Sequence, residues 1–345
     1  MNATIQRLET DDFTEVEQSL SAWDQRYRQI GPGKFHGDLV LTEMGSLGIF
    51  GGRWGSKIHY QGVPPEGTVA LALTLFQPED GRWMGQRMTS SEVIVQPSAS
   101  EGELISAPFW DGAVLTIPES DLAQAMTDFG DVDPLAMLRR PHLVRLSAEA
   151  SARVRKACIA YLRAARSHEA GTDAATRISE MATSTVELIT RELVSARIPY
   201  DSKPATHRER HLVREVAQHC ADRERNPIRI PDLCREVGVS QRTVRYAFQH
   251  VTGLSPLTFL KRQRLNRARD ALRDRSPTGT LIKRIAFSQG FQHLGQFSQD
   301  YRQLFGETPT ETLRRRGATV PPQNLVERTI VDVSALRGKL ADADD

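Results

Sequence analysis

The chain has 345 residues and an almost balanced charge, with 45 Lys and Arg against 43 Asp and Glu. A chain of this length is expected to form two domains or slightly more. No apolar run is long enough to cross a bilayer, and the first residues, Met-Asn-Ala-Thr-Ile-Gln-Arg, lack an apolar signal segment. These features argue against a membrane-spanning or secreted protein, so we expect a cytoplasmic one.

The N-terminal part has strand character from about residue 35 to 117. Short apolar runs punctuated by Gly and Pro, at intervals of roughly ten residues, are typical of a β-sandwich or a small β-barrel. The predicted strands include residues 39–41, 47–50, 58–60, 69–75, 92–95 and 113–117.

Aromatic residues concentrate in the same strand-rich part. Trp54, Trp83, Trp110, Phe35 and Phe76 could line a ligand pocket, or they could simply fill the core. The sequence does not identify an effector.

Two helical stripes follow the strands, with a turn at 168–173 between them. The first stripe comprises Val154, Cys158, Tyr161, Leu162 and Ala165. The second comprises Ile178, Met181, Thr185, Leu188, Ile189 and Glu192. This antiparallel pair is either a dimerisation element or two helices packed on the strand-rich domain, and both interpretations stay open at this point.

Residues 230–309 contain an internal repeat with a period of about fifty residues. Four positions recur with a shift of 52, namely Ile230, Leu233, Cys234 and Gly238 as Ile282, Ile285, Ala286 and Gly290. Four more recur with a shift of 53, namely Val244, Phe248, Gly253 and Pro256 as Phe297, Tyr301, Gly306 and Pro309. The extra residue falls just after the glycine, where a turn can absorb it.

Each copy predicts two helices joined by a tight turn. In the first copy, apolar residues at helical spacing end at Gly238, which can adopt the left-handed conformation of a sharp stop. Ser240 can then cap a second helix over 241–251, with Val244 and Phe248 facing inward. This is the unit that lays its second helix in a DNA major groove. An ordinary helical hairpin is the alternative, and it explains a matched second copy poorly.

Charge supports an interaction with nucleic acid. Residues 207–316 hold 22 Lys and Arg against 11 Asp and Glu, although the whole chain carries only +2. Neutralising phosphates supplies much of the affinity of proteins for DNA. We therefore expect 207–316 to be the part that binds DNA.

A single helix from Pro256 to about Arg273 is predicted to connect the two copies. At about 1.5 Å per residue it would span roughly 27 Å, comparable with the roughly 34 Å between successive major grooves on one face of DNA. One chain would thus carry two recognition helices.

The second copy carries a recognisable signature. It reads Ile285-Ala-Phe-Ser-Gln-Gly-Phe-Gln-His-Leu-Gly-Gln-Phe297, followed by Tyr301-Arg-Gln-Leu-Phe-Gly-Glu-Thr-Pro309. Residues 207–316 resemble the DNA-binding domain of the AraC/XylS family of transcriptional regulators. The His-Leu-Gly-Gln-Phe stretch is similar to ethanolamine-utilisation and XylS-type members.

The resemblance implies that both recognition helices meet DNA. The implied DNA-binding residues are Ser240, Gln241, Arg242, Arg245, Tyr246, Gln249, His293, Gly295, Gln296, Ser298, Gln299 and Arg302. Among them Arg242, Arg245 and Tyr246 are expected at base edges. Because Gly295 has no side chain and Ser298 and Gln299 carry no charge, we expect the first copy to supply most of the sequence specificity.

The expected fold class is α+β with two domains. The division is 1–145, a cupin-like β-barrel or sandwich serving as sensor, as the resemblance implies; 146–198, the helical pair; 199–206, a linker; 207–316, the double helix-turn-helix domain; and 317–345, a flexible tail. The family further implies an activator with double-stranded DNA and RNA polymerase as partners, a possible small-molecule effector and a homodimer. A regulator that is always dimeric and has no ligand is the alternative.

No constellation of catalytic residues or metal ligands is evident. His36 and His59 lack the other ligands of a metal site, and no Gly-rich phosphate loop occurs. Cys158, Cys220 and Cys234 form no Cys-x-x-Cys pair and suit buried positions in a reducing compartment. We therefore predict no enzyme, no cofactor and no metal. A repair-type protein with an enzymatic N-terminal domain is the weaker hypothesis, because residues 1–157 contain no cysteine.

Overall fold

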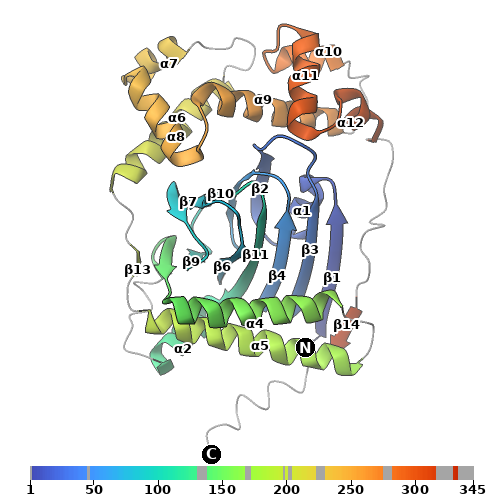
Figure 1. Ribbon diagram of the computed structural model, residues 1–345, viewed down its shortest axis with the longest axis vertical. Helices are drawn as coiled ribbons and strands as arrows, with labels where there is room; N and C mark the ends of the chain where they lie inside the picture. Colours follow the sequence, from blue (N-terminus) through green and yellow to red (C-terminus); the bar gives the residue numbers. More distant parts are fainter. Residues whose placement is uncertain are drawn as a thin grey trace, which may run out of the picture.

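The computed structural model describes residues 2–44, 47–129, 138–167, 172–196, 199–200, 204–222, 230–274, 282–315 and 329–332. Within these ranges the chain is α+β, as expected. Two antiparallel sheets occupy the N-terminal part, whereas the described segments between residues 204 and 315 are mainly helical (Figure 1). No helix in the described ranges has the length and apolar character needed to span a membrane.

The larger sheet has the strand order β13-β12-β9-β6-β11-β4-β3-β1-β14. Its strands are β1 (Asn2–Thr10), β3 (Gly37–Met44), β4 (Leu47–Trp54), β6 (Thr68–Phe76), β9 (Glu92–Pro97), β11 (Trp110–Pro118), β12 (His142–Arg145), β13 (Pro199–Tyr200) and β14 (Thr329–Asp332). Its central strands, such as β6, are buried on both faces, which is why they read as nearly continuous apolar runs rather than alternating ones.

The smaller sheet has the order β2-β5-β10-β7-β8. Its strands are β2 (Asp24–Gln29), β5 (Ile58–Val63), β7 (Gly81–Trp83), β8 (Gln86–Met88) and β10 (Gly102–Ile105). Side chains of both sheets, among them Tyr27, Trp54, Trp83 and Trp110, form one apolar core between them. We call the two sheets, together with α1 (Phe13–Ser19) and the turns that connect these elements, the sheet region.

Three helices cover the outer face of the larger sheet: α2 (Glu119–Phe129), α4 (Ala148–Arg166) and α5 (Thr172–Ser195) (Figure 1). Val154, Tyr161 and Ile189 share a second apolar core with residues of β6 and β11. The predicted helical pair is therefore confirmed, and it packs on the sheet, which was one of the two interpretations left open. Its role in dimerisation stays a prediction.

Seven helices form what we call the C-terminal helical region, over the described residues between 204 and 315. They are α6 (Pro204–Asp222), α7 (Ile230–Val237), α8 (Gln241–Thr252), α9 (Pro256–Arg273), α10 (Ile282–Ser288), α11 (Leu294–Phe305) and α12 (Pro309–Arg315). Helix α9 runs between the α6–α8 group and the α10–α12 group, as predicted for a connecting helix (Figure 1).

Some segments differ from the sequence-based expectations. The expected linker 199–206 includes β13, which pairs with β12, and the start of α6, while 201–203 lie outside the described residues. Within the expected flexible tail, Thr329–Asp332 form β14, which pairs with β1; the rest of the tail lies outside the described residues. Both departures depend on pairing with distant strands, which local sequence does not reveal.

Candidate functional site

Helix α8, the first candidate recognition helix, is built as its sequence predicts. Gly238 has a φ of 71°, the left-handed conformation expected at the turn. The Ser240 hydroxyl caps the helix by accepting a hydrogen bond from the Thr243 N–H at 3.1 Å. Val244 and Phe248 are fully buried, so they fix which side of the helix faces outward.

The outward side of α8 carries the residues expected to bind DNA. Ser240, Gln241, Arg242, Arg245, Tyr246 and Gln249 are all exposed. The Arg242 guanidinium lies 5.4 Å from the centre of the Tyr246 ring, a cation–π arrangement at the surface. The face thus combines positive charge, an aromatic ring and hydrogen-bonding groups, which suits a nucleic-acid surface.

Helix α11, the second candidate recognition helix, follows the same plan with a weaker start. Gly290 has a φ of 74°, but the side chain of His293, the capping residue, makes no capping hydrogen bond. His293, Gly295, Gln296, Gln299 and Arg302 are exposed, and Ser298 is half-buried. A β-carbon added to Gly295 would meet no atom within 4 Å, so this face is open.

His59 lies in the core and contacts polar side chains from two other parts of the chain. It is buried, with Nε2 2.8 Å from Glu103 Oε1, and Glu103 Oε2 lies 3.4 Å from Nε of Arg210 on α6. The Nδ1 atom of His59 lies 3.2 Å from the side-chain nitrogen of Gln263 on α9. These contacts join the sheet region to the C-terminal helices. His36 is exposed and lies 3.2 Å from Asp11.

The described cysteines and carboxylates are of the types found in the ligand sets of metal sites. No cluster of three or more potential metal ligands occurs among the residues that the structure describes. Cys158 and Cys234 are buried as predicted, whereas Cys220 is only partly buried. Burial raises the pKa of the Cys158 thiol to about 12, which leaves it almost wholly protonated near neutral pH.

A cavity of about 50 Å³ lies between the two sheets. Trp54, Trp83 and Trp110 line it and also belong to the apolar core between the sheets, so both sequence-based interpretations of these residues stay open. Phe35 belongs to the same core but does not line the cavity, and Phe76 is 56% exposed.

Sequence reasoning missed other residues of the cavity wall. These are Trp23, Gln25, Tyr27, Tyr60 and Gln96, together with smaller apolar residues. The alternation of inward and outward positions along β2 and β5 is the signal that could have found Gln25, Tyr27 and Tyr60.

Several polar atoms in this cavity wall have no hydrogen-bond partner within the described protein. They are the Tyr60 hydroxyl, the Trp83 indole nitrogen and both amide atoms of Gln25. No charged side chain is found among the described residues that line the cavity. The wall therefore offers an uncharged aromatic surface with donors and acceptors still to be satisfied.

Comparison with known proteins places the similarity in the C-terminal helical region. Residues 233–315 match a protein-family model described as a helix-turn-helix domain. A probable thc operon regulatory protein of Rhodococcus erythropolis is 34% identical over 122 residues, 35% of each chain. An XylDLEGF operon transcriptional activator of Pseudomonas putida is 32% identical over 100 residues, 29% of this chain and 31% of the relative. The chain thus spans about a third of the length of these curated relatives.

Among solved structures, a probable AraC family transcriptional regulator from Rhodopseudomonas palustris is 42% identical. The match covers 31% of this chain and 97% of that chain, with a TM-score of 0.29.

Proposed function

We propose that the chain is a sequence-specific DNA-binding transcriptional regulator of the AraC/XylS family, because its C-terminal helical region matches a helix-turn-helix family model and is similar to operon regulators. In this proposal α7–α8 and α10–α11 are two helix-turn-helix units, and α8 and α11 enter successive major grooves. The relatives named as activators favour activation. We propose RNA polymerase as a partner because the family resemblance implies it.

The observation that carries the proposal is the repetition of one exposed polar face on two helices joined by α9. The left-handed glycines Gly238 and Gly290 end the first helix of each pair, with φ of 71° and 74°. The left-handed glycines Gly253 and Gly306 end the candidate recognition helices, with φ of 69° and 70°. A purely structural hairpin needs no such duplicated outward face.

Selection of bound sequences from a random duplex pool by the full chain tests this function. We expect two blocks of enriched bases about one helical turn apart, because each candidate recognition helix reads one groove. Recovery of unenriched sequence, with equal affinity for all duplexes, would contradict sequence-specific regulation.

We further propose that the cavity between the sheets receives a neutral effector. Its wall carries no charge among the described lining residues, so an ionised ligand would lose its hydration without a compensating partner. The unpaired atoms of Gln25, Tyr60 and Trp83 favour a molecule that is mostly apolar and has one hydrogen-bonding group. Trp23 and Gln25 are half-buried, and we propose that they shift to admit the effector, because 50 Å³ is smaller than the roughly 150 Å³ of an apolar cavity that holds benzene.

Benzamide and its anionic analogue benzoate are suitable probes for the full chain. We expect benzamide to change tryptophan fluorescence and benzoate to do so more weakly, with the Tyr60→Phe variant reducing the benzamide response. Regulation additionally requires the bound probe to change DNA affinity, because a ligand shifts an equilibrium only through unequal binding to its two states. Equal responses to both probes would contradict a neutral effector.

The repair-enzyme hypothesis has less support. Cys158, the cysteine nearest to the sheet region in sequence, is buried, and the raised pKa of its thiol makes it a poor nucleophile. We propose no catalytic residues. The homodimer and the cupin-like nature of the sheet region remain parts of the proposal.

A further inference from the structure

The two candidate recognition helices meet the sheet region at equivalent positions of the internal repeat. Nε of Arg82 donates a hydrogen bond to the carbonyl of His250 in α8, at 2.8 Å. The Gly33 N–H donates to the carbonyl of Gln303 in α11, at 3.0 Å. Residues 250 and 303 are related by the 53-residue shift of the repeat. The sheet region therefore holds the same backbone position of both copies.

The glycine that ends each of these helices also lies against the sheet region. A β-carbon on Gly253 would stand 3.0 Å from Arg82 Nη1 and 3.2 Å from Lys57 Nζ. A β-carbon on Gly306 would stand 2.8 Å from the backbone nitrogen of Lys34. Cations near the C-terminal end of a helix interact favourably with its dipole. Arg82 and Lys57 therefore interact favourably with the end of α8, and the missing side chain of Gly253 leaves room for them.

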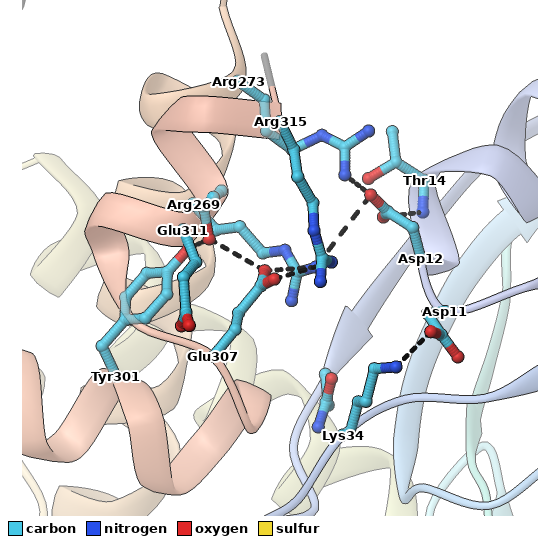
Figure 2. Close-up of polar contacts among 12 residues, drawn as sticks. Asp11, Asp12, Thr14, Lys34, Arg269, Arg273, Tyr301, Glu307, Glu311 and Arg315 are labelled. Atoms are coloured by element: carbon cyan, nitrogen blue, oxygen red, sulfur yellow. Dashed lines mark hydrogen bonds and ion pairs between the residues drawn. The ribbon is translucent and has the colours of Figure 1, made fainter. Parts of the chain in front are cut away.

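An ion-pair cluster strengthens the contact on the α11 side. Figure 2 shows Asp12, from the start of α1, paired with Arg273 at the end of α9. Asp12 also lies 4.0 Å from Arg269, which is 3.0 Å from Glu307, the residue after the terminal glycine of α11. Arg269 is almost fully buried. Leaving a buried charge without its ion-pair partner is costly. This cluster therefore favours the arrangement of the α10–α12 group on the sheet region in which all of these charges are paired.

The α6–α8 group has its own charged contacts. Arg210 lies beside the buried Glu103, and Arg214 is 2.8 Å from Glu101, both carboxylates belonging to the smaller sheet or the turn that precedes β10. Each helical group is therefore attached separately to one body, the sheet region, in addition to being joined by α9.

The contacts leave the proposed DNA-binding faces uncovered. Arg242 and Arg245 on α8 and Gln296 and Gln299 on α11 are exposed, whereas the contacts with the sheet region fall at the C-terminal ends of both helices. The sheet region consequently does not block access to these faces. What it can control is the orientation of one helix relative to the other.

We propose that Arg82 and Asp12 are positioning residues that fix the relative orientation of α8 and α11. The inference rests on the proposed function, in which both helices read one DNA site. Successive base pairs are about 3.4 Å apart along each strand, so a small rotation of one helical group places its helix out of register. The sheet region then determines the spacing between the two base blocks of a DNA site at which both helices can bind.

Spin labels at Gln249→Cys and Gln296→Cys in the full chain measure this orientation without DNA. Cys220 is replaced by Ser because it is partly exposed, and the buried Cys158 and Cys234 are retained. We expect one narrow distance distribution in this background and a clearly broader or bimodal one after Arg82→Ala or Asp12→Asn. Asn also caps helices well, so Asp12→Asn removes the charge and keeps a cap for α1.

Matched controls separate positioning from a general loss of stability. Arg87→Ala and Asp11→Asn break ion pairs within the sheet region, to Asp80 and Lys34 respectively, and should leave the distance distribution narrow. Arg273→Lys keeps the positive charge beside Asp12 and should also preserve it. A distribution unchanged in both Arg82→Ala and Asp12→Asn would overturn the proposal.

The DNA measurement uses the site selected by the full chain and the same site with one base pair inserted between its blocks. We expect the unlabelled wild-type chain to bind the longer site several-fold more weakly, and Arg82→Ala and Asp12→Asn to reduce that ratio toward one. An unchanged ratio contradicts the positioning role. If selection yields no preferred DNA site, the proposed function fails. The distances between the spin labels still decide whether Arg82 and Asp12 fix the relative orientation of α8 and α11.

Discussion

The side-chain amide of Asn266, in the middle of α9, hydrogen-bonds both backbone groups of Gln29 at the end of β2. Its nitrogen donates to the Gln29 carbonyl at 2.8 Å, and its oxygen accepts from the Gln29 N–H at 3.1 Å. Both residues are fully buried. Asn266 thus forms with the Gln29 backbone the two hydrogen bonds that a neighbouring strand would otherwise form, although the two residues are 237 positions apart. The side-chain nitrogen of Gln29 continues this chain of contacts to the carbonyl of Leu304 in α11, at 2.6 Å.

Asn266→Asp should be strongly destabilising because a carboxylate cannot donate to the Gln29 carbonyl and its charge would be fully buried. We expect a loss of about 3–5 kcal/mol near neutral pH, as for a buried charge without its partner. Burial raises the pKa of such a carboxyl, so the loss should shrink in acid, where the group becomes neutral.

Urea unfolding of the full chain at two pH values measures this effect. Gln292→Glu, the same chemical change at an exposed position, is the control and should shift the midpoint little. Equal shifts for the two variants would show that the Asn266 contact contributes nothing.

Substituting Gly238 and Gly295 by Ala tests whether the turn at Gly238 requires a left-handed backbone. Gly238 has a φ of 71°, and Gly295 lies within α11; a β-carbon at either position would meet no atom within 4 Å. Gly238→Ala should therefore cost stability through the backbone alone, on the order of 1 kcal/mol. Gly295→Ala should stabilise the helix by about 0.5–1 kcal/mol. Thermal unfolding of both variants checks the sign, and stabilisation by Gly238→Ala would contradict the left-handed turn.

The C-terminal helices could be predicted closely because their signals are local. Ser255 caps α9, Pro256 begins it, and the apolar spacing predicted its end at Arg273. The six predicted strands lie within β3, β4, β5, β6, β9 and β11 for the same reason: each carries its own apolar run.

The missed elements lack such local signals. β2, with the sequence Asp-Gln-Arg-Tyr-Arg-Gln, has one buried aromatic residue among polar ones, and it is a strand because β5 pairs with it. The contacts between Arg82 and His250 and between Asp12 and Arg273 join residues far apart in sequence, so no spacing rule could find them. The residues proposed to bind DNA were found through the repeat, whereas those proposed to orient them needed the structure.

Arg242→Ala and Arg245→Ala should reduce sequence specificity without unfolding the chain. Both side chains are exposed on the side of α8 opposite the buried Val244 and Phe248, so the core does not need them. Each substitution should cost about 1–3 kcal/mol on the selected site if the side chain pairs with a base edge. Fluorescence anisotropy on the selected and a scrambled duplex provides the measurement.

Arg163→Ala is the control for lost charge, since Arg163 is exposed on α4, away from the C-terminal helices. Equal weakening on both duplexes would mean that Arg242 or Arg245 contacts only phosphate. A large fall in melting temperature would contradict the surface assignment.

Glu103 should make the attachment of α6 to the sheet region sensitive to acid. Burial alone would raise the pKa of this carboxyl, but the hydrogen bond from His59 and the attraction of His59 and Arg210 outweigh it and lower the pKa from 4.5 to about 2. A carboxyl with a lower pKa in the folded state stabilises the protein above its unfolded pKa and loses that effect as it becomes protonated. The stabilisation from Glu103 should therefore be complete above about pH 4.5 and decline toward about pH 2.

Urea midpoints across this range should fall more steeply for the wild-type chain than for Glu103→Gln, which cannot titrate. Glu66→Gln, at an exposed position, should follow the wild-type curve, because it leaves the buried carboxylate in place. Parallel curves for the wild-type chain and Glu103→Gln would show that this ion pair does not stabilise the fold.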